Sequence, residues 1–112
     1  MSHEKRLEEA HPERVPEPLL TLAKYLERSL DKATSIVMTR HTTSACTVHL
    51  GDPSGPLEDL MQIDTITTLF ENDILESTSS GANQMHIGGQ LYRFVRSFTR
   101  VGDAAAVVFS AD

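Results

Sequence analysis

The sequence of 112 residues is poor in the features that mark disulfide-bonded, zinc-binding and membrane proteins. Its single cysteine, Cys46, excludes an intramolecular disulfide and any zinc site built from several cysteines. It contains no run of about 18 apolar residues, which a membrane-spanning helix would need. The charged segment 1–14 lacks the apolar stretch of a secretory signal. Together these absences predict a cytoplasmic protein with no membrane association.

Aromatic residues are also scarce: the chain has two tyrosines, four phenylalanines and no tryptophan. The core therefore has to be mainly aliphatic, and the few aromatic side chains are needed inside it. With 39 % hydrophobic and 23 % charged residues, the composition is typical of a globular protein. We expect one domain over residues 16–112, preceded by a flexible arm at 1–15 in which charged residues and proline dominate.

The net charge of −6 is unevenly distributed along the chain. Residues 51–83 contain seven acidic residues and neither lysine nor arginine. The candidate binding residues of this segment are Glu58, Asp59, Asp64, Glu71, Asp73 and Glu76. A concentration of one sign of charge can steer an oppositely charged partner, although it can equally serve solubility. We therefore expect a non-enzymatic interaction or accessory module whose acidic surface binds an unidentified protein.

The first half of the domain predicts a helix followed by a hairpin. Leu19, Leu22, Leu26 and Leu30 recur at helical spacing and indicate a helix over 17–33, with continuation to Met38 as the alternative. Residues 36–39 and 46–48 are rich in β-branched side chains and predict the two strands of a hairpin within 35–50. Glycine and proline then interrupt the chain at 51–56.

Residues 57–76 have two competing patterns. Leucines at helical spacing and acidic residues after Pro56 favour a helix. The β-branched stretch 63–68 favours a strand, and Thr68 with Glu71 could form a capping box that opens a second, short helix. We expect a mostly helical segment and leave open a break near 63–67.

The C-terminal third predicts a three-strand meander with strands over 84–87, 90–100 and 104–110. Gly88-Gly89 and Gly102-Asp103 suit two-residue turns. Turns at these positions pair Met85 with Tyr92, Phe98 with Val107, and Arg96 with Phe109. One sheet face then collects Met85, Tyr92, Phe94, Phe98, Val107 and Phe109, with Arg96 as the misfit at an edge.

These elements predict an α+β fold. An antiparallel sheet of four or five strands, made of the hairpin and the meander, has the N-terminal helix and the middle acidic helix packed on one face. Exposed sheet edges are compatible with a monomer or a homodimer.

No set of residues predicts catalysis. Cys46 and His49 lie three positions apart and point to opposite sides of a strand, so they cannot form a nucleophile–base pair. His41, His49 and His86 form the alternative, a small-molecule-binding or enzymatic site on the sheet. Their spacing does not match a metal triad, and we expect neither a metal nor a cofactor.

A second alternative is nucleic-acid binding through the arginines of the meander, Arg93, Arg96 and Arg100. Basic residues interleaved with aromatics are the ingredients of a single-strand binding platform. However, Arg93 faces away from Arg96 and Arg100, and the chain is acidic overall. Both features argue against nucleic acid as a partner.

The block from Gln90 to Asp103, QLYRFVRSFTRVGD, together with the short helix and hairpin before it, resembles a small family of proteins from Burkholderia-type bacteria. The family has no assigned activity. The resemblance therefore implies a bacterial, cytoplasmic protein and carries over no functional residue.

Overall fold

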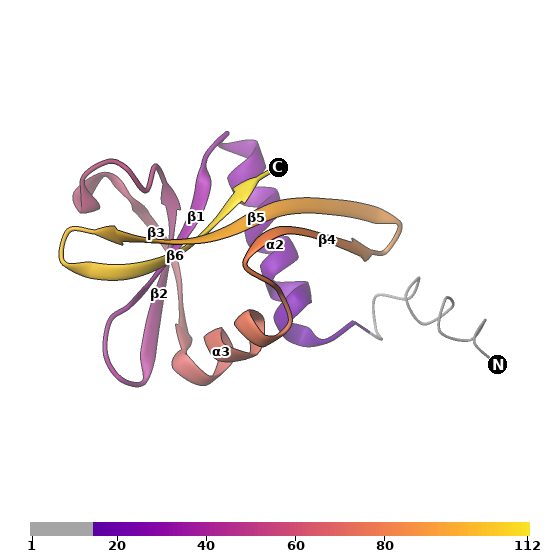
Figure 1. Cartoon of the computed structure of the whole chain (residues 1–112), viewed down its shortest axis with the longest axis horizontal. Helices are drawn as coiled ribbons and strands as arrows, with labels where there is room; N and C mark the ends of the chain where they lie inside the picture. Colours follow the sequence, from indigo (N-terminus) through magenta and orange to yellow (C-terminus); the bar gives the residue numbers. More distant parts are fainter. Residues whose placement is uncertain (1–14) are drawn as a thin grey trace.

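The computed structural model describes residues 15–112, so most of the predicted arm lies outside the described part of the chain. The elements, in chain order, are α2 (Glu17–Asp31), β1 (Ser35–Arg40), β2 (Ala45–Gly51), a single 3-10 turn η2 (Leu57–Asp59), β3 (Met61–Thr67), α3 (Thr68–Glu76), β4 (Gly81–Ile87), β5 (Gln90–Val101) and β6 (Ala104–Ala111). Figure 1 shows their arrangement.

The six strands form one antiparallel sheet in the order β3-β2-β1-β6-β5-β4. The chain thus builds two three-strand meanders, β1–β3 and β4–β6, which α3 connects. The sheet becomes continuous where the first strand pairs with the last, with Ile36 opposite Phe109 and Met38 opposite Val107. The α+β class is confirmed, and the sheet has six strands where four or five were expected.

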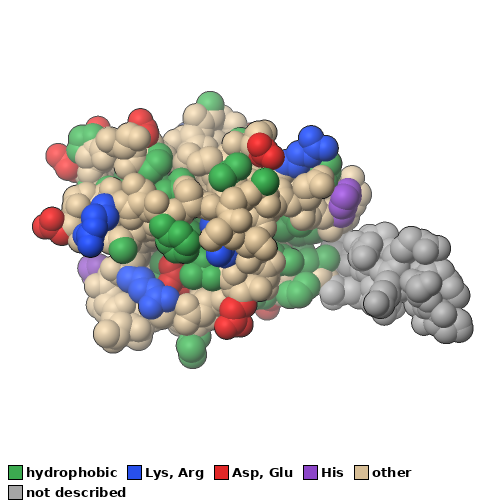
Figure 2. Space-filling view, viewed as in Figure 1, with side chains coloured by type: hydrophobic (Ala, Val, Ile, Leu, Met, Phe, Trp, Pro, Cys, Tyr) green, Lys and Arg blue, Asp and Glu red, His purple; other side chains and the backbone are tan. Residues whose placement is uncertain are grey.

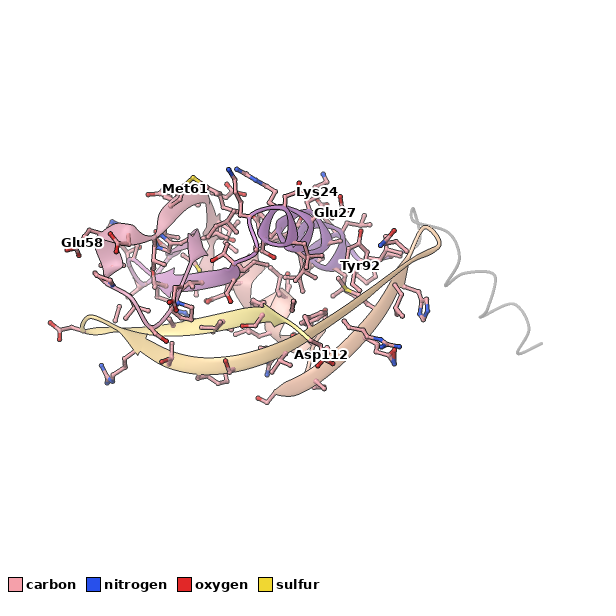
Figure 3. The ribbon with its side chains drawn as sticks, turned by 90° about the horizontal axis from the view of Figure 1, so that it is seen from above. Lys24, Glu27, Glu58, Met61, Tyr92 and Asp112 are labelled. Carbon is pink, nitrogen blue, oxygen red and sulfur yellow. The ribbon has the colours of Figure 1, made fainter. Side chains whose placement is uncertain are left out.

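Both helices pack on the same face of the sheet, and the main core lies between the two layers (Figure 3). This core receives Leu22 and Leu26 from α2 and Ile74 from α3. The sheet contributes alternate residues of each strand, as the period of two requires. They are Ile36, Met38, Cys46, Val48, Leu50, Ile87, Tyr92, Phe94, Val107 and Phe109.

The opposite face of the sheet is covered in part by the connection between β2 and β3. Leu60 from this connection packs against Val37, Val101 and Ala106, which form a second, smaller cluster. Gly51 permits the close approach: its φ is +156°, and a Cβ placed on it would lie 2.5 Å from Leu60 Cδ2. The break at 51–56 therefore serves to fold the chain back over this face.

Residues 57–76 differ most from the prediction, which was a mostly helical segment. Residues 61–67 form β3, an edge strand paired with β2, and only residues 68–76 form an α-helix. The β-branched stretch thus determines the local structure, because it can pair with the exposed edge of β2. The helix is capped by Thr67, whose Oγ1 accepts a hydrogen bond from Phe70 N at 3.0 Å, one residue before the expected Thr68.

The predicted strand registers of the C-terminal meander are confirmed. Met85 lies opposite Tyr92, Phe98 opposite Val107 and Arg96 opposite Phe109. Gly88 and Gly89 have φ of +59° and +81°, as the tight turn between β4 and β5 requires.

The N-terminal helix is also confirmed, but it ends earlier than expected. Ala33 adopts φ +52° just after the helix. Its N–H donates to Leu30 O, and Thr34 N–H donates to Ser29 O. This is the pattern of a Schellman motif, usually built on glycine. The helix therefore stops at Asp31 without the glycine that would have signalled it.

Two tyrosines hold α2 to both halves of the sheet. Tyr25 of α2 donates to Asp64 Oδ2 of β3 at 2.5 Å. Tyr92 of β5 donates to Glu27 Oε2 of α2, and Figure 3 shows these two side chains meeting between helix and sheet. Because the two bonds reach strands near opposite edges of the sheet, they fix the angle at which α2 crosses it.

The Tyr92 contact predicts a loss of stability at alkaline pH. Burial and the hydrogen bond to Glu27 raise the pKa of Tyr92 to about 12, while an unfolded tyrosine ionises near pH 10. Above about pH 10 the unfolded chain releases this proton first, so the free energy of unfolding falls as the pH rises toward about 12. We expect a smaller fall in Tyr92→Phe than in the unaltered protein, measured by urea unfolding at about pH 9 and about pH 11. Equal falls in both proteins would contradict this assignment.

Neither of the helices within residues 15–112 combines the length and the apolar character needed to cross a membrane.

Candidate functional site

A groove of about 280 Å³ opens on the helix-covered face, between α3 and the hairpin of β5 and β6. Its lining residues are Met38, Arg40, Glu71, Leu75, Phe98, Ala104, Ala105, Ala106 and Val107. We call it the α3 groove. Figure 2 shows hydrophobic side chains gathered near the middle of the view, with Lys or Arg side chains around them. The groove is thus an apolar depression with a charged border.

The strand register explains the floor of the groove. Met38, Val107 and Phe98 lie side by side on β1, β6 and β5 and point to the same face. Beside this row stands Ala105, whose small, exposed side chain leaves space above the sheet. Leu75 of α3 forms the opposite wall. The depression exists because α3 does not extend over this end of the sheet.

Phe98 is the most unusual residue of the groove, because 63 % of its surface is exposed. The sequence pattern assigned it to the core together with Phe94, and its position on the sheet face is as predicted. Phe94, on the same face of the same strand, is only 1 % exposed. The two differ because the core reaches Phe94 and ends before Phe98.

An ion pair between half-exposed Arg40 and buried Glu71 closes the α3 side of the groove. Glu71 of α3 is 2 % exposed, and its Oε1 lies 2.8 Å from Arg40 Nε. Arg40 also donates from Nη2 to Asn72 Oδ1 at 2.8 Å. A carboxylate buried to this degree requires such a partner. The pair thus anchors α3 to the end of β1 and shapes the groove wall.

Cys46 lies close to this ion pair and is fully buried. Burial and the nearby Glu71 carboxylate raise the pKa of the thiol to about 12. Because only the thiolate reacts, its fraction at pH 8 is about a thousandfold below that of a free cysteine. We expect no measurable reaction of the folded protein with Ellman's reagent over an hour, and complete reaction in denaturant. Rapid reaction of the folded protein would show that Cys46 is accessible.

Arg96, the misfit of the predicted meander, has a structural role. Its Nη1 donates to Leu75 O at 2.7 Å and to Thr78 O at 3.1 Å, at the C-terminal end of α3. Its guanidinium also lies over the Phe98 ring, 5.8 Å from the centroid. A cation at a helix C-terminus satisfies carbonyls that have no partner within the helix. The guanidinium is therefore bound to protein, where an edge position in water was expected.

The acidic residues proposed from the sequence do not form one patch. Glu58 and Asp59 lie on η2, in the connection that covers the other face of the sheet. Asp64 accepts the bond from Tyr25, and Glu71 is the buried partner of Arg40. Asp73 and Glu76 remain exposed on α3. A common acidic surface is therefore limited to parts of the predicted set.

The three candidate histidines lie on separate parts of the fold. His41 is exposed in the β1–β2 turn, and His86 is exposed on β4. His49 lies 3.2 Å from Thr39 Oγ1 on the face opposite the helices, and burial lowers its pKa. The strands of His49 and His86 are four strand spacings apart, about 19 Å. Within residues 15–112 no group of three metal-ligating side chains is found.

The arginines likewise divide between the two faces, as the sequence predicted. Arg93 is exposed on the side of β5 that faces away from the helices. Arg100 lies on the groove side and donates to Asp103 O at 3.2 Å. With Arg96 held by carbonyls, the three do not make a continuous basic track.

The α3 groove itself was not predicted from the sequence. A signal for it exists in the strand lengths: the predicted strand 84–87 is far shorter than its neighbour 90–100. The second half of the longer strand therefore had to extend past its partner, carrying Phe98 away from the covered part of the sheet.

Comparison with known proteins does not add a function to this geometry. No family model matches the chain, and neither a curated protein nor a solved structure matches it. The resemblance to a Burkholderia-type family therefore stays a prediction.

Proposed function

We propose that the protein is a non-enzymatic interaction module that binds an apolar segment of a partner protein in the α3 groove. The observation that carries this proposal is the exposure of Phe98 at the mouth of an aliphatic groove. Leaving a phenylalanine ring in water costs about 2 kcal/mol relative to burying it. A partner side chain seated against Phe98 and Val107 recovers part of this free energy.

The dimensions of the groove suit one or two side chains of a peptide. Its volume of about 280 Å³ lies just below the usual range of ligand sites, about 300–1,000 Å³, and it is open to solvent along one side. Aliphatic and aromatic lining favours a hydrophobic anchor residue, the usual centre of a protein interface. Asp73 and Glu76 are exposed on α3 but do not line the groove, whereas Arg40 does and Arg96 lies over Phe98. The proposal therefore rests on the apolar lining and assigns no sign of charge to the partner.

A display library of random 12-residue peptides tests the proposal. We expect peptides that bind the protein to share a large apolar residue. Ala105→Trp fills the groove from an exposed position on its floor, so these peptides should bind this variant at least about tenfold more weakly. The matched control is Ala111→Trp, which places the same side chain at an exposed position of β6 outside the groove.

Two outcomes would contradict the proposal. If no apolar peptides are enriched, or if the enriched peptides bind Ala105→Trp and the unaltered protein with equal affinity, the α3 groove is not the binding site. Circular dichroism of both variants should match the unaltered protein, because each substitution is at a solvent-exposed residue.

A further inference from the structure

One stretch of β5 lacks a second neighbouring strand. β6 pairs with β5 from Phe94 to Val101, whereas β4 pairs with it only as far as Arg96. Within residues 15–112, positions 97–101 therefore have a strand on one side alone. Alternate residues of such an edge direct their N–H and C=O groups away from the sheet, where a further strand can bind them.

The β3 edge of the sheet is protected, whereas the β4 edge is unpaired but carries none of the exposed large hydrophobic residues of the described chain. β3 pairs with β2 through a register shift between Val48 and His49, and such a bulge impedes the addition of a strand. At the start of β4, the Asn83 side chain donates to Ser79 O and Gly81 O. The 97–101 edge has a regular register and carries the exposed Phe98. It is the edge best suited to pairing.

We propose that a second copy of this chain pairs with residues 97–101 in antiparallel orientation, with the two-fold axis at Thr99. This goes beyond the proposed function, because it concerns the strand edge and a different partner. In this register Phe98 lies opposite Arg100 of the second copy, on the face that carries the helices. The ring and the guanidinium form a cation–π pair across the interface, once from each chain.

Charge selects this register over its neighbours. A shift that places Phe98 opposite Phe98 brings Arg100 opposite Arg96 of the second copy. The reverse shift places Arg100 opposite Arg100. Like charges directly opposite each other destabilise a strand pair. Only the register centred on Thr99 keeps the arginines apart while covering both Phe98 rings.

The pairing covers Phe98 at one border of the α3 groove and leaves the rest of the groove floor open. The added strand extends the sheet sideways, whereas the groove floor consists of β1 and β6 as well as β5. The two grooves then lie on the same side of one continuous sheet. Five residues of strand pairing bury less than the roughly 1,200 Å² of a standard interface. We therefore expect a reversible dimer with a dissociation constant on the order of 10–100 µM.

Sedimentation equilibrium over a concentration series measures this association. We expect the unaltered protein to shift from its monomer mass of 12.4 kDa toward twice that value with rising concentration. Phe98→Lys should stay monomeric, because lysine would face Arg100 of the second copy. The matched control is Leu69→Lys on α3, where leucine is 76 % exposed, and this variant should dimerise as before. A protein that stays monomeric at about 1 mM overturns the proposal.

Cysteine cross-linking tests the register. Thr99→Cys places two thiols directly opposite each other, with Cα atoms about 5 Å apart, within the range of a disulfide. In Ser97→Cys the two thiols lie four residues apart along the strands, about 13 Å. Mild oxidation should therefore link Thr99→Cys at least about tenfold faster than Ser97→Cys. Equal rates, or a dimer that Phe98→Lys does not weaken, overturn the proposal. Peptide affinities measured at about 1 µM protein, where the chain is monomeric, test the groove separately.

Discussion

Replacing Phe94 by alanine is expected to lower the free energy of unfolding by about 4 kcal/mol. Phe94 is 1 % exposed, and its ring packs against Phe109 with centroids 5.9 Å apart and an interplanar angle of 56°. The substitution removes a ring from a core that has few aromatic side chains and leaves a cavity that its neighbours fill only in part. Small domains have a total stability of about 5–15 kcal/mol. Urea unfolding followed by circular dichroism would measure the loss.

Phe98→Ala is the matched control, because it removes the same ring from the same face of the same strand. With 63 % of its surface exposed, Phe98 should contribute less than about 0.5 kcal/mol. Measurements at low protein concentration keep the proposed dimer from adding to this value. If the two variants were equally destabilised, the core would extend to Phe98 and the groove would not exist as described.

The second large effect is expected at the Arg40–Glu71 pair. Arg40→Met should lower the free energy of unfolding by about 3 kcal/mol, because it leaves the Glu71 carboxylate buried without its cation. We take the lower end of the range for such pairs because Arg40 is itself 51 % exposed. The loss should be concentrated in the contact of α3 with β1, and amide hydrogen exchange of residues 68–76 would detect it.

A double substitution separates the ion pair from the packing around it. Arg40→Met with Glu71→Met removes both charges and keeps apolar volume, so most of the stability should return. Arg93→Met, on the other face of the sheet, serves as the control and should change stability by less than about 0.5 kcal/mol. A double variant as unstable as Arg40→Met alone would show that the buried carboxylate is not the cause.

The C-terminal meander could be predicted in detail because three independent signals agree there. Gly88-Gly89 and Gly102-Asp103 set the turns, and the alternation of apolar residues set the face. A shift by one residue would have moved Phe94 and Phe109 into water. Because such a shift would remove these two rings from the core, the register can be predicted from the sequence alone.

β3 could not be predicted with the same certainty because it is an edge strand. All seven of its residues are exposed or half-buried, so the alternation that marks a strand is weak. The leucines on either side of it also fit a helical pattern. Pairing with β2 favours the strand over the helix for residues 61–67. This contact joins distant parts of the chain, so the local sequence gives no sign of it.

The α3 groove depends on long-range contacts to a greater degree than β3 does. Its floor joins Met38 to Val107, and its wall joins Arg40 to Glu71. The sequence marked Glu71 as one of several acidic surface residues, whereas its burial follows from the position of α3 against β1. Composition can locate charge along the chain but cannot say which charges the fold will pair.

The pairing of β1 with β6 also constrains the order in which the protein can fold. Ile36 reaches its partner only after Phe109 has been synthesised, so the two meanders emerge from the ribosome one after the other. Until then the inner edge of β1 is unpaired and open to wrong partners. Closing a contact of this span is slow compared with forming either hairpin. Of the strands in this sheet, β6 comes last in the chain and is therefore the one that joins both halves.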